Sequence, residues 1–187
     1  MGASPTTDTR FRRIFDEHFE AITRYCLRRL PVADANEAAA EVFLVAWKKI
    51  DRVPDGEEAL PWLYGVARNV VRNSQRSTRR SGRLAGRLGG LAPQAAPGPE
   101  PQVLRRQEDA ELVAALGSLK AEDQEVLRLR AYEGLTNPEI AVVLGCSPEA
   151  AKKRVTRALG RLRKVAGLTE PEDFAGQPRP VAEGGDR

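Results

Sequence analysis

The sequence has few of the residues that build metal sites and redox sites. Its 187 residues include only two cysteines and one histidine. Cys26 and Cys146 are far apart and lack the paired spacing of a zinc or redox motif, and His18 has no second histidine to work with. We expect reduced, half-buried cysteines, a surface or packing role for His18, no metal and no cofactor.

Long apolar runs are also missing. No stretch approaches the roughly 18 apolar residues of a membrane helix, and the N-terminal segment MGASPTTDTRFRR has no apolar core of a signal peptide. We therefore expect a cytoplasmic protein without membrane insertion. The chain also shows no carboxylate and histidine cluster at ligand spacing, no glycine loop that could cradle phosphate and no nucleophile motif, so we expect no catalytic site and no enzyme.

The composition favours helices. Aromatic residues make up 5% of the chain and charged residues 30%, which suits small helical units better than a large sheet sandwich. Apolar residues recur every three or four positions from Phe11 to Leu30, which predicts an amphipathic helix that Pro31 ends. A second helix should start near Asp34, an acceptable N-cap, and a loop should span Asp51 to Glu58.

A third helix is predicted from about Ala59 to Arg80, and the Gly- and Pro-rich stretch after it has linker composition. Helical periodicity resumes at about Val103. We predict an all-α fold of two small helical domains joined by a flexible linker. The expected divisions are a disordered N-terminus at 1–9, a first domain at 10–80, a linker at 81–102, a second domain at 103–168 and a disordered tail at 169–187.

The strongest local pattern, from Thr136 to Lys164, predicts a helix-turn-helix. Thr136 can cap one short helix, Gly145 permits a tight turn, and Ser147 can cap the next helix. Ala150 to Thr169 contains seven basic residues and no acidic residue. An isolated basic run is usually a solvated helix face. Here the caps, the turn and the apolar register favour DNA binding, by the outward residues Lys152, Lys153, Arg154 and Arg157.

A second basic segment follows Trp62 on the third predicted helix. It carries Arg68, Arg72, Arg76, Arg79 and Arg80, with Asn69 among them. Arginines can hold phosphates, an amide can read a base edge, and aromatic rings can stack on unpaired bases. Trp62 is about equally well explained as a core residue, but the helix as a whole is a candidate for nucleic-acid binding.

These two units in this order resemble the extracytoplasmic-function group of the sigma-70 family, from about Phe11 to Ala166. FRRIFDEHFEAITRYCLRRL resembles the first conserved helix, DANEAAAEVFLVAWKKI the polymerase-binding helix, and LPWLYGVARNVVRNSQRSTRR the promoter-opening helix. The C-terminal half resembles the domain for the upstream promoter element. The resemblance implies a factor that binds promoter DNA and core RNA polymerase, and that an anti-sigma factor commonly holds inactive.

The resemblance also implies roles for individual residues. In the first domain, Asn69 would capture a flipped base of the −10 element and Val53 would lie in the adjoining specificity loop. For the −35 element, the matches are Lys152, Lys153, Thr156 and Arg157, with Arg130 on the preceding helix and Ser147 at the start of the recognition helix. The clamp helices of the largest polymerase subunit would meet Asp34, Glu37, Glu41 and Phe43.

Three rival classes make different predictions. An ordinary helix-turn-helix regulator would bind duplex operators alone, usually as a dimer, whereas we expect a monomer when the chain is free. A nuclease would need a cluster of ligands that the sequence does not show. An adaptor that binds only protein helices would tolerate charge reversal of Lys152 and Arg157.

Overall fold

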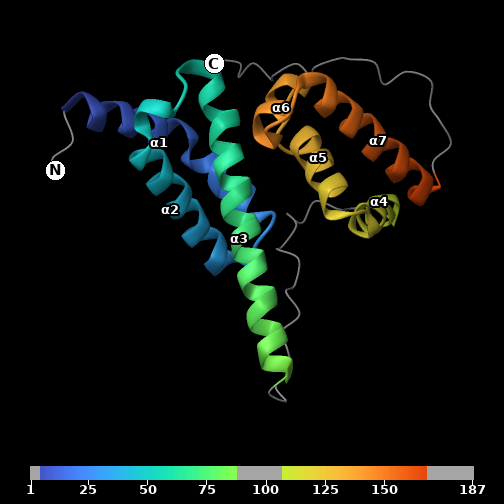
Figure 1. Ribbon diagram of the computed structural model, residues 1–187. Helices are drawn as coiled ribbons and strands as arrows, with labels where there is room; N and C mark the ends of the chain where they lie inside the picture. Colours follow the sequence, from blue (N-terminus) through green and yellow to red (C-terminus); the bar gives the residue numbers. More distant parts are fainter. Residues whose placement is uncertain (1–4, 88–106, 168–187) are drawn as a thin grey trace, which may run out of the picture.

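The computed structural model describes residues 5–87 and 107–167, and within these the chain is helical without strands (Figure 1). Three long helices come first: α1 Pro5–Leu27, α2 Val32–Lys48 and α3 Ala59–Arg87. Four shorter helices follow: α4 Gln107–Ser118, α5 Ala121–Ala131, α6 Asn137–Leu144 and α7 Pro148–Ala166. The predicted all-α fold in two helical domains is therefore confirmed.

The first domain is a three-helix bundle in which each helix contributes one apolar stripe. Ile22, Val42 and Leu63, from the three helices, are fully buried. An aromatic group fastens α1 to α2, with ring centroids 4.8 Å apart between Phe15 and Phe43 and 5.0 Å apart between Phe11 and Trp47. Packing of these large apolar surfaces supplies the main stabilisation of the bundle.

Several predicted boundaries were wrong by a turn or two. The first helix begins at Pro5, within the N-terminus that we expected to be disordered, and ends at Leu27. The second helix takes Pro31 as its N-cap rather than starting near Asp34. The third continues to Arg87, beyond the predicted end at Arg80. Residues 1–4, 88–106 and 168–187, which include most of the predicted linker and the predicted tail, lie outside the described residues.

Burial determines the surroundings of the two cysteines and of His18. Cys26 is buried, Cys146 is half-buried, and both are free thiols. Burial raises the pKa of the Cys26 thiol to about 11, although nearby Arg29 opposes the shift. His18 is 6% exposed, and burial lowers its pKa, which Glu17 partly offsets. A neutral packing role for His18 follows.

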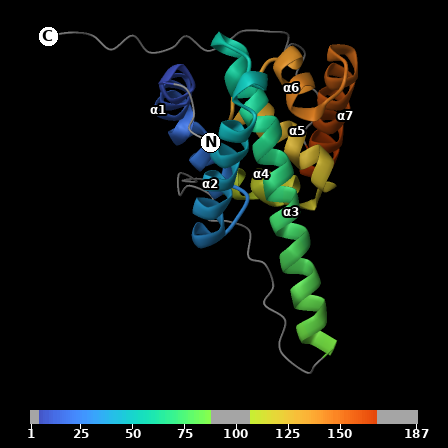
Figure 2. The ribbon, with the colours of Figure 1, turned by 60° about the vertical axis from the view of Figure 1, so that its left-hand side comes forward.

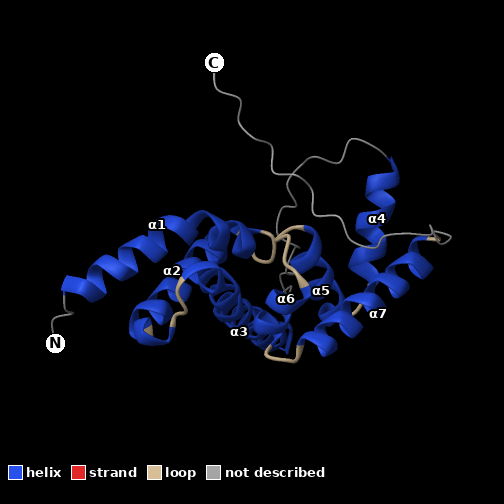
Figure 3. Cartoon of the chain, turned by 90° about the horizontal axis from the view of Figure 1, so that it is seen from above, coloured by secondary structure: helices blue, strands red, loops and turns tan. Residues whose placement is uncertain are grey.

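The second domain packs α4 and α5 against α7, with α6 bridging to the first domain. Figures 1 and 2 show α6 lying alongside the first half of α3, whose second half extends away from the other helices, and Figure 3 shows α6 next to α3 from above. At this crossing a β-carbon on Gly65 would lie 3.7 Å from the backbone of Val143. The small glycine therefore lets α3 and α6 approach closely, and the two domains are in direct contact at this crossing.

Candidate nucleic-acid interface

The helix-turn-helix is built from local capping groups. At the start of α6, Thr136 N donates to Glu139 Oε2 at 2.7 Å and Glu139 N donates to Thr136 Oγ1 at 3.5 Å, which makes a reciprocal capping box. Gly145 ends α6 in the left-handed region at φ 63°. Ser147 Oγ then accepts from Ala150 N at 3.2 Å and starts α7. The two predicted caps and the predicted turn are confirmed.

The N-terminal half of α7 presents a continuous basic face. Lys152, Lys153, Arg154 and Arg157 are exposed, as is Thr156, whereas Ala151, Val155 and Ala158 point into the core. Among the described residues these four cations make no ion pair. Farther along the helix, Arg161 pairs with Asp123 of α5 at 2.7 Å. The face is therefore free for an external anion, while the far end of α7 is tied to its own domain.

Arg130 and Ser147 flank this basic face. Arg130 is exposed at the end of α5, and its Nη1 donates to the carbonyl of Leu135 at 3.0 Å, so the side chain reinforces the turn before α6. Ser147 is exposed but its hydroxyl already serves the helix start. Ser147 therefore starts α7 and Arg130 supports the turn before α6, and the contact of both residues with duplex DNA stays a prediction.

The basic residues of α3 divide between two faces. Arg68, Arg72 and Arg76 recur at every fourth position and form one stripe, here called the arginine stripe. They line a hollow of about 380 Å³ between the domains, opposite Glu122, Glu125 and Arg128 of α5. Asn69 and Arg80 are exposed. Arg79 belongs to α3, but its side chain lies outside the described residues.

Trp62 and Val53 are held by the first domain. Trp62 is half-buried and packs against the core. Val53 lies in the loop after α2, as the resemblance implies, and its side chain is a core residue at 2% exposed, while its role at the −10 element stays a prediction. Its carbonyl accepts from Arg10 Nη2 at 2.6 Å, and the same guanidinium reaches Ile50 O at 3.1 Å and Asp55 Oδ1 at 3.1 Å.

The predicted polymerase face of α2 is acidic with an apolar centre. Glu37 and Glu41 are exposed and Asp34 is half-buried. Phe43 is 3% exposed, because it faces Phe15 inside the bundle, and its contact with polymerase stays a prediction. Leu44 is 50% exposed and lies one turn beyond Glu41. Its helical spacing from Glu37 and Glu41 was the sequence signal that could have identified it.

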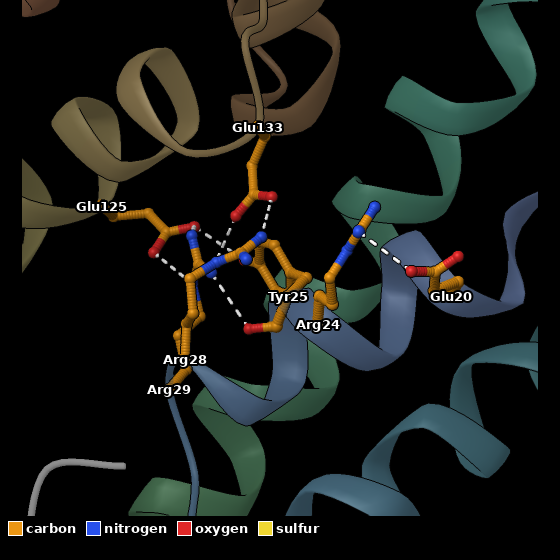
Figure 4. Close-up of polar contacts among 7 residues, drawn as sticks. All are labelled: Glu20, Arg24, Tyr25, Arg28, Arg29, Glu125 and Glu133. Carbon is orange, nitrogen blue, oxygen red and sulfur yellow. Dashed lines mark hydrogen bonds and ion pairs between the residues drawn. The ribbon is translucent and has the colours of Figure 1, made fainter. Parts of the chain in front are cut away.

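A polar cluster joins the two domains, and sequence reasoning missed it. We call Tyr25, Arg28, Arg29, Glu125 and Glu133 the interdomain cluster (Figure 4). Arg29 Nε donates to Glu125 Oε2 at 2.9 Å and Arg29 Nη1 donates to Glu133 Oε1 at 3.1 Å. Tyr25 Oη donates to Glu125 Oε1 at 2.7 Å, and Arg28 also pairs with Glu133. The side chains of Arg29 and Glu133 are 2% and 1% exposed.

The pKa shifts in this cluster follow from burial and pairing. Burial opposes ionisation of Glu125, but the charge and hydrogen bonds of Arg29 outweigh it and lower the pKa of Glu125. Burial likewise opposes the charge of Arg29, yet Tyr25, Glu125 and Glu133 raise its pKa. Burial and the neighbouring carboxylates raise the pKa of Tyr25 well above its ordinary value. At neutral pH the cluster therefore holds ionised partners and a neutral phenol.

Residues 5–87 and 107–167 also bear on two other types of feature, metal centres and membrane-spanning helices. In that part of the chain, no group of three or more histidine, cysteine, aspartate or glutamate residues is placed to hold a metal ion. Nor is any of its helices long and apolar enough to cross a membrane.

Comparisons with known families and proteins agree with this geometry. Residues 14–81 match Sigma-70 region 2 and residues 109–162 match Sigma-70, region 4. The ECF RNA polymerase sigma factor SigL of Mycobacterium tuberculosis is 31% identical over 165 residues, covering 87% of this chain and 92% of SigL. The RNA polymerase sigma factor CnrH of Cupriavidus metallidurans is 32% identical over 140 residues, covering 71% of this chain and 73% of CnrH.

Solved structures share the fold. The sigma factor RpoE, in complex with the anti-sigma factor NepR from Bartonella quintana, superposes with a TM-score of 0.63 at 22% identity, covering 86% of this chain and 98% of that one. CnrH in complex with the cytosolic domain of CnrY gives a TM-score of 0.57 at 24% identity, with 86% and 89% covered. With both regions matched in order and the curated relatives covered over most of their length, the chain belongs to the sigma-70 family of RNA polymerase sigma factors, in its extracytoplasmic-function group.

Proposed function

We propose that this sigma factor binds core RNA polymerase through residues 10–80, places Asn69 and its arginines at the −10 element, and places α7 at the −35 element. The observation that carries the proposal is the unpaired basic face of α7 on a fully capped helix-turn-helix, because an N-terminal helix half of this kind fits the major groove. Residues 103–168 supply this second contact, and residues 81–102 link it to the first.

The polymerase contact uses the exposed side of α2. Glu37 and Glu41 offer carboxylates to basic clamp helices, and Leu44, one turn beyond Glu41, offers apolar area for burial. Asp34 extends the acidic edge toward the start of the helix. The factor acts by binding alone, without a catalytic site or cofactor, in the cytoplasm where polymerase works.

Promoter opening follows from two linked contacts. With polymerase holding both domains, the −35 contact raises the effective concentration of the −10 contact. Trapping an unstacked base near Asn69 offsets an unpairing cost of a few kcal/mol. The solved structures of RpoE and CnrH are complexes with NepR and with the cytosolic domain of CnrY, and we propose that an anti-sigma factor likewise restrains this chain, which is a monomer when free.

Transcription on a genomic fragment library tests the proposal. Sigma-free bacterial core polymerase is incubated with the wild-type chain, with Asn69→Ala, or with no factor, and transcript starts are mapped. Discrete new starts that weaken with Asn69→Ala are expected, and Glu111→Gln, on the exposed side of α4 and outside the proposed −10 and polymerase contacts, serves as the control. No new starts, together with tight duplex binding by the chain alone, would instead indicate a classical regulator.

A further inference from the structure

The loop between α2 and α3 has little regular structure of its own. It consists of two single turns, Ile50–Arg52 and Gly56–Glu58, joined by extended backbone. Val53 has φ −71° and ψ 121°, and Asp55 has φ −89° and ψ 159°. Because so short a turn makes few hydrogen bonds within itself, the shape of the loop depends on contacts from neighbouring elements.

Arg10 of α1 supplies such a contact with a single guanidinium. Its Nη1 donates to Ile50 O at 3.1 Å, and its Nη2 donates to Val53 O at 2.6 Å and to Asp55 Oδ1 at 3.1 Å. A guanidinium is planar and presents its N–H groups in a fixed fork. The two carbonyls that it binds are therefore held in a fixed relation to each other and to α1.

The helical period explains why Arg10 reaches the loop. Arg10, Ile14 and His18 recur at every fourth position of α1, which places them on one side of the helix. Ile14 and His18 are buried, and they line a hollow of about 560 Å³ beside the loop. Arg13 adds an ion pair with Asp55 at 3.5 Å, but both of its side chains are largely exposed. Arg10 is therefore the stronger polar link between α1 and the loop.

The loop is held from the inside as well. The side chains of Ile50 and Val53 are buried in the core, whereas Asp51 and Arg52 are exposed. Val53 thus anchors the loop by its side chain, and Arg10 anchors it by the carbonyl of the same residue. A loop held in this way presents its exposed groups in one arrangement and loses less entropy when it meets a partner.

We propose that Arg10 is a positioning residue for the −10 contact: by holding the carbonyls of Ile50 and Val53, it keeps the loop in the shape that discriminates between −10 sequences. The inference rests on the proposed function, in which this loop adjoins the base contact of Asn69. Arg10 acts through the loop and contacts no base. Loss of its guanidinium should weaken discrimination at the −10 element and leave the −35 contact unchanged.

Hydrogen exchange of the free chain tests the structural step. The amides of Arg52 and Val53 donate to the carbonyls three residues earlier, at 2.8 Å and 3.2 Å, so their exchange reports on opening of the loop. Arg10→Gln should speed this exchange by about tenfold, because hydrogen bonds from a charged donor are lost. Circular dichroism monitors the helix content of the variant.

Two further variants isolate the role of the fork. Arg10→Lys keeps the charge but has one nitrogen where Arg10 uses two, so it should resemble Arg10→Gln. Arg24→Gln is the matched control, because Arg24 lies on the same helix and also pairs with a carboxylate, that of Glu20 at 3.0 Å, at an exposed site. It removes the same charge and should exchange its loop amides at the wild-type rate.

Transcription from varied promoters tests the functional step. A promoter found with the wild-type chain and core polymerase is varied one position at a time, first in its −10 element and then in its −35 element. The ratio of transcript from the original −10 element to that from a mismatched one should fall at least about fivefold in Arg10→Gln. The ratio for −35 mismatches should stay the same. A general loss of stability would weaken all promoters together and leave both ratios unchanged.

The outcomes separate this inference from the proposed function. A −10 ratio that Arg10→Gln leaves unchanged, or loop amides that keep the wild-type exchange rate, would overturn the inference alone. Wild-type behaviour of Arg10→Lys would also overturn it, since charge would then suffice without the fork. Loss of helix in Arg10→Gln would overturn it as well, because Arg10 would then hold the fold. If the wild-type chain directs no start sites, the proposed function fails and the inference fails with it.

Discussion

The turn between α6 and α7 offers a test in which one substitution is made at two glycines with opposite expected effects. Gly145 has φ 63° and ψ 46°, and an added β-carbon would meet nothing within 4 Å. Gly145→Ala therefore carries a backbone penalty alone, about 1–2 kcal/mol for an L-residue in the left-handed region. Gly160 lies inside α7, where an added β-carbon also meets open space. Gly160→Ala should stabilise the domain by about 0.8–1 kcal/mol through helix propensity.

Hydrogen exchange of the α6 and α7 amides is the suitable assay, because it reports on this domain alone. Gly145→Ala should speed exchange about 5- to 30-fold and weaken binding to the −35 duplex, since the turn sets the position of α7. Gly160→Ala should slow exchange about fivefold. Gly145→Asn should fall between wild type and alanine because asparagine tolerates this backbone region. Equal effects of alanine at both positions would refute the backbone argument.

Three further predictions follow from the site and the core. Although burial opposes it, Arg29 lowers the pKa of Glu125 in the contact between the domains, so the contribution of Glu125 to that contact should be complete at neutral pH. The contribution should begin to weaken below the ordinary glutamate pKa of about 4.3 and be lost as the pH falls through the lowered pKa. X-ray scattering against pH checks this, and the double variant Glu125→Gln with Glu133→Gln should show no such transition. Lys153→Gln should make the plot of log affinity against log salt concentration less steep by about 0.9, for any duplex bound by polymerase carrying this factor. An unchanged slope would exclude a phosphate contact by Lys153. Leu63→Ala should lower the free energy of unfolding of the first domain, measured with urea, by about 2–5 kcal/mol, because Leu63 is fully buried. A smaller loss would mean that neighbouring side chains move in to fill the cavity.

The second domain was largely predictable because its signals are local. The caps and the turn are formed by Thr136, Gly145 and Ser147 with near neighbours in the sequence, so capping and turn chemistry alone located the helix-turn-helix. The same locality explains the exposure of Lys152 and Arg157, which the helical period assigns to the outer face. Pro31 misled the prediction, because it was taken only as the end of the first helix, whereas it is the N-cap of α2.

Contacts between residues that are distant in the sequence could not be predicted from the sequence alone. Phe43 and Val53 are apolar residues whose burial depends on which neighbouring element covers them, here α1 and the loop that Arg10 holds. Glu125 and Glu133 look like ordinary surface acids of a charged helix end. Only the packing of α5 beside α1 reveals that Arg29 neutralises them.

Arg10 lies outside the stretch that matches Sigma-70 region 2, which begins at residue 14. Its guanidinium nevertheless holds the loop after α2 by two carbonyls and by Asp55. Domain exchange between related factors at the region boundary would therefore separate this loop from the side chain that shapes it. A chimaera that is meant to keep this loop in its present shape needs the first helix from Pro5 onward, because Arg10 of that helix holds the loop.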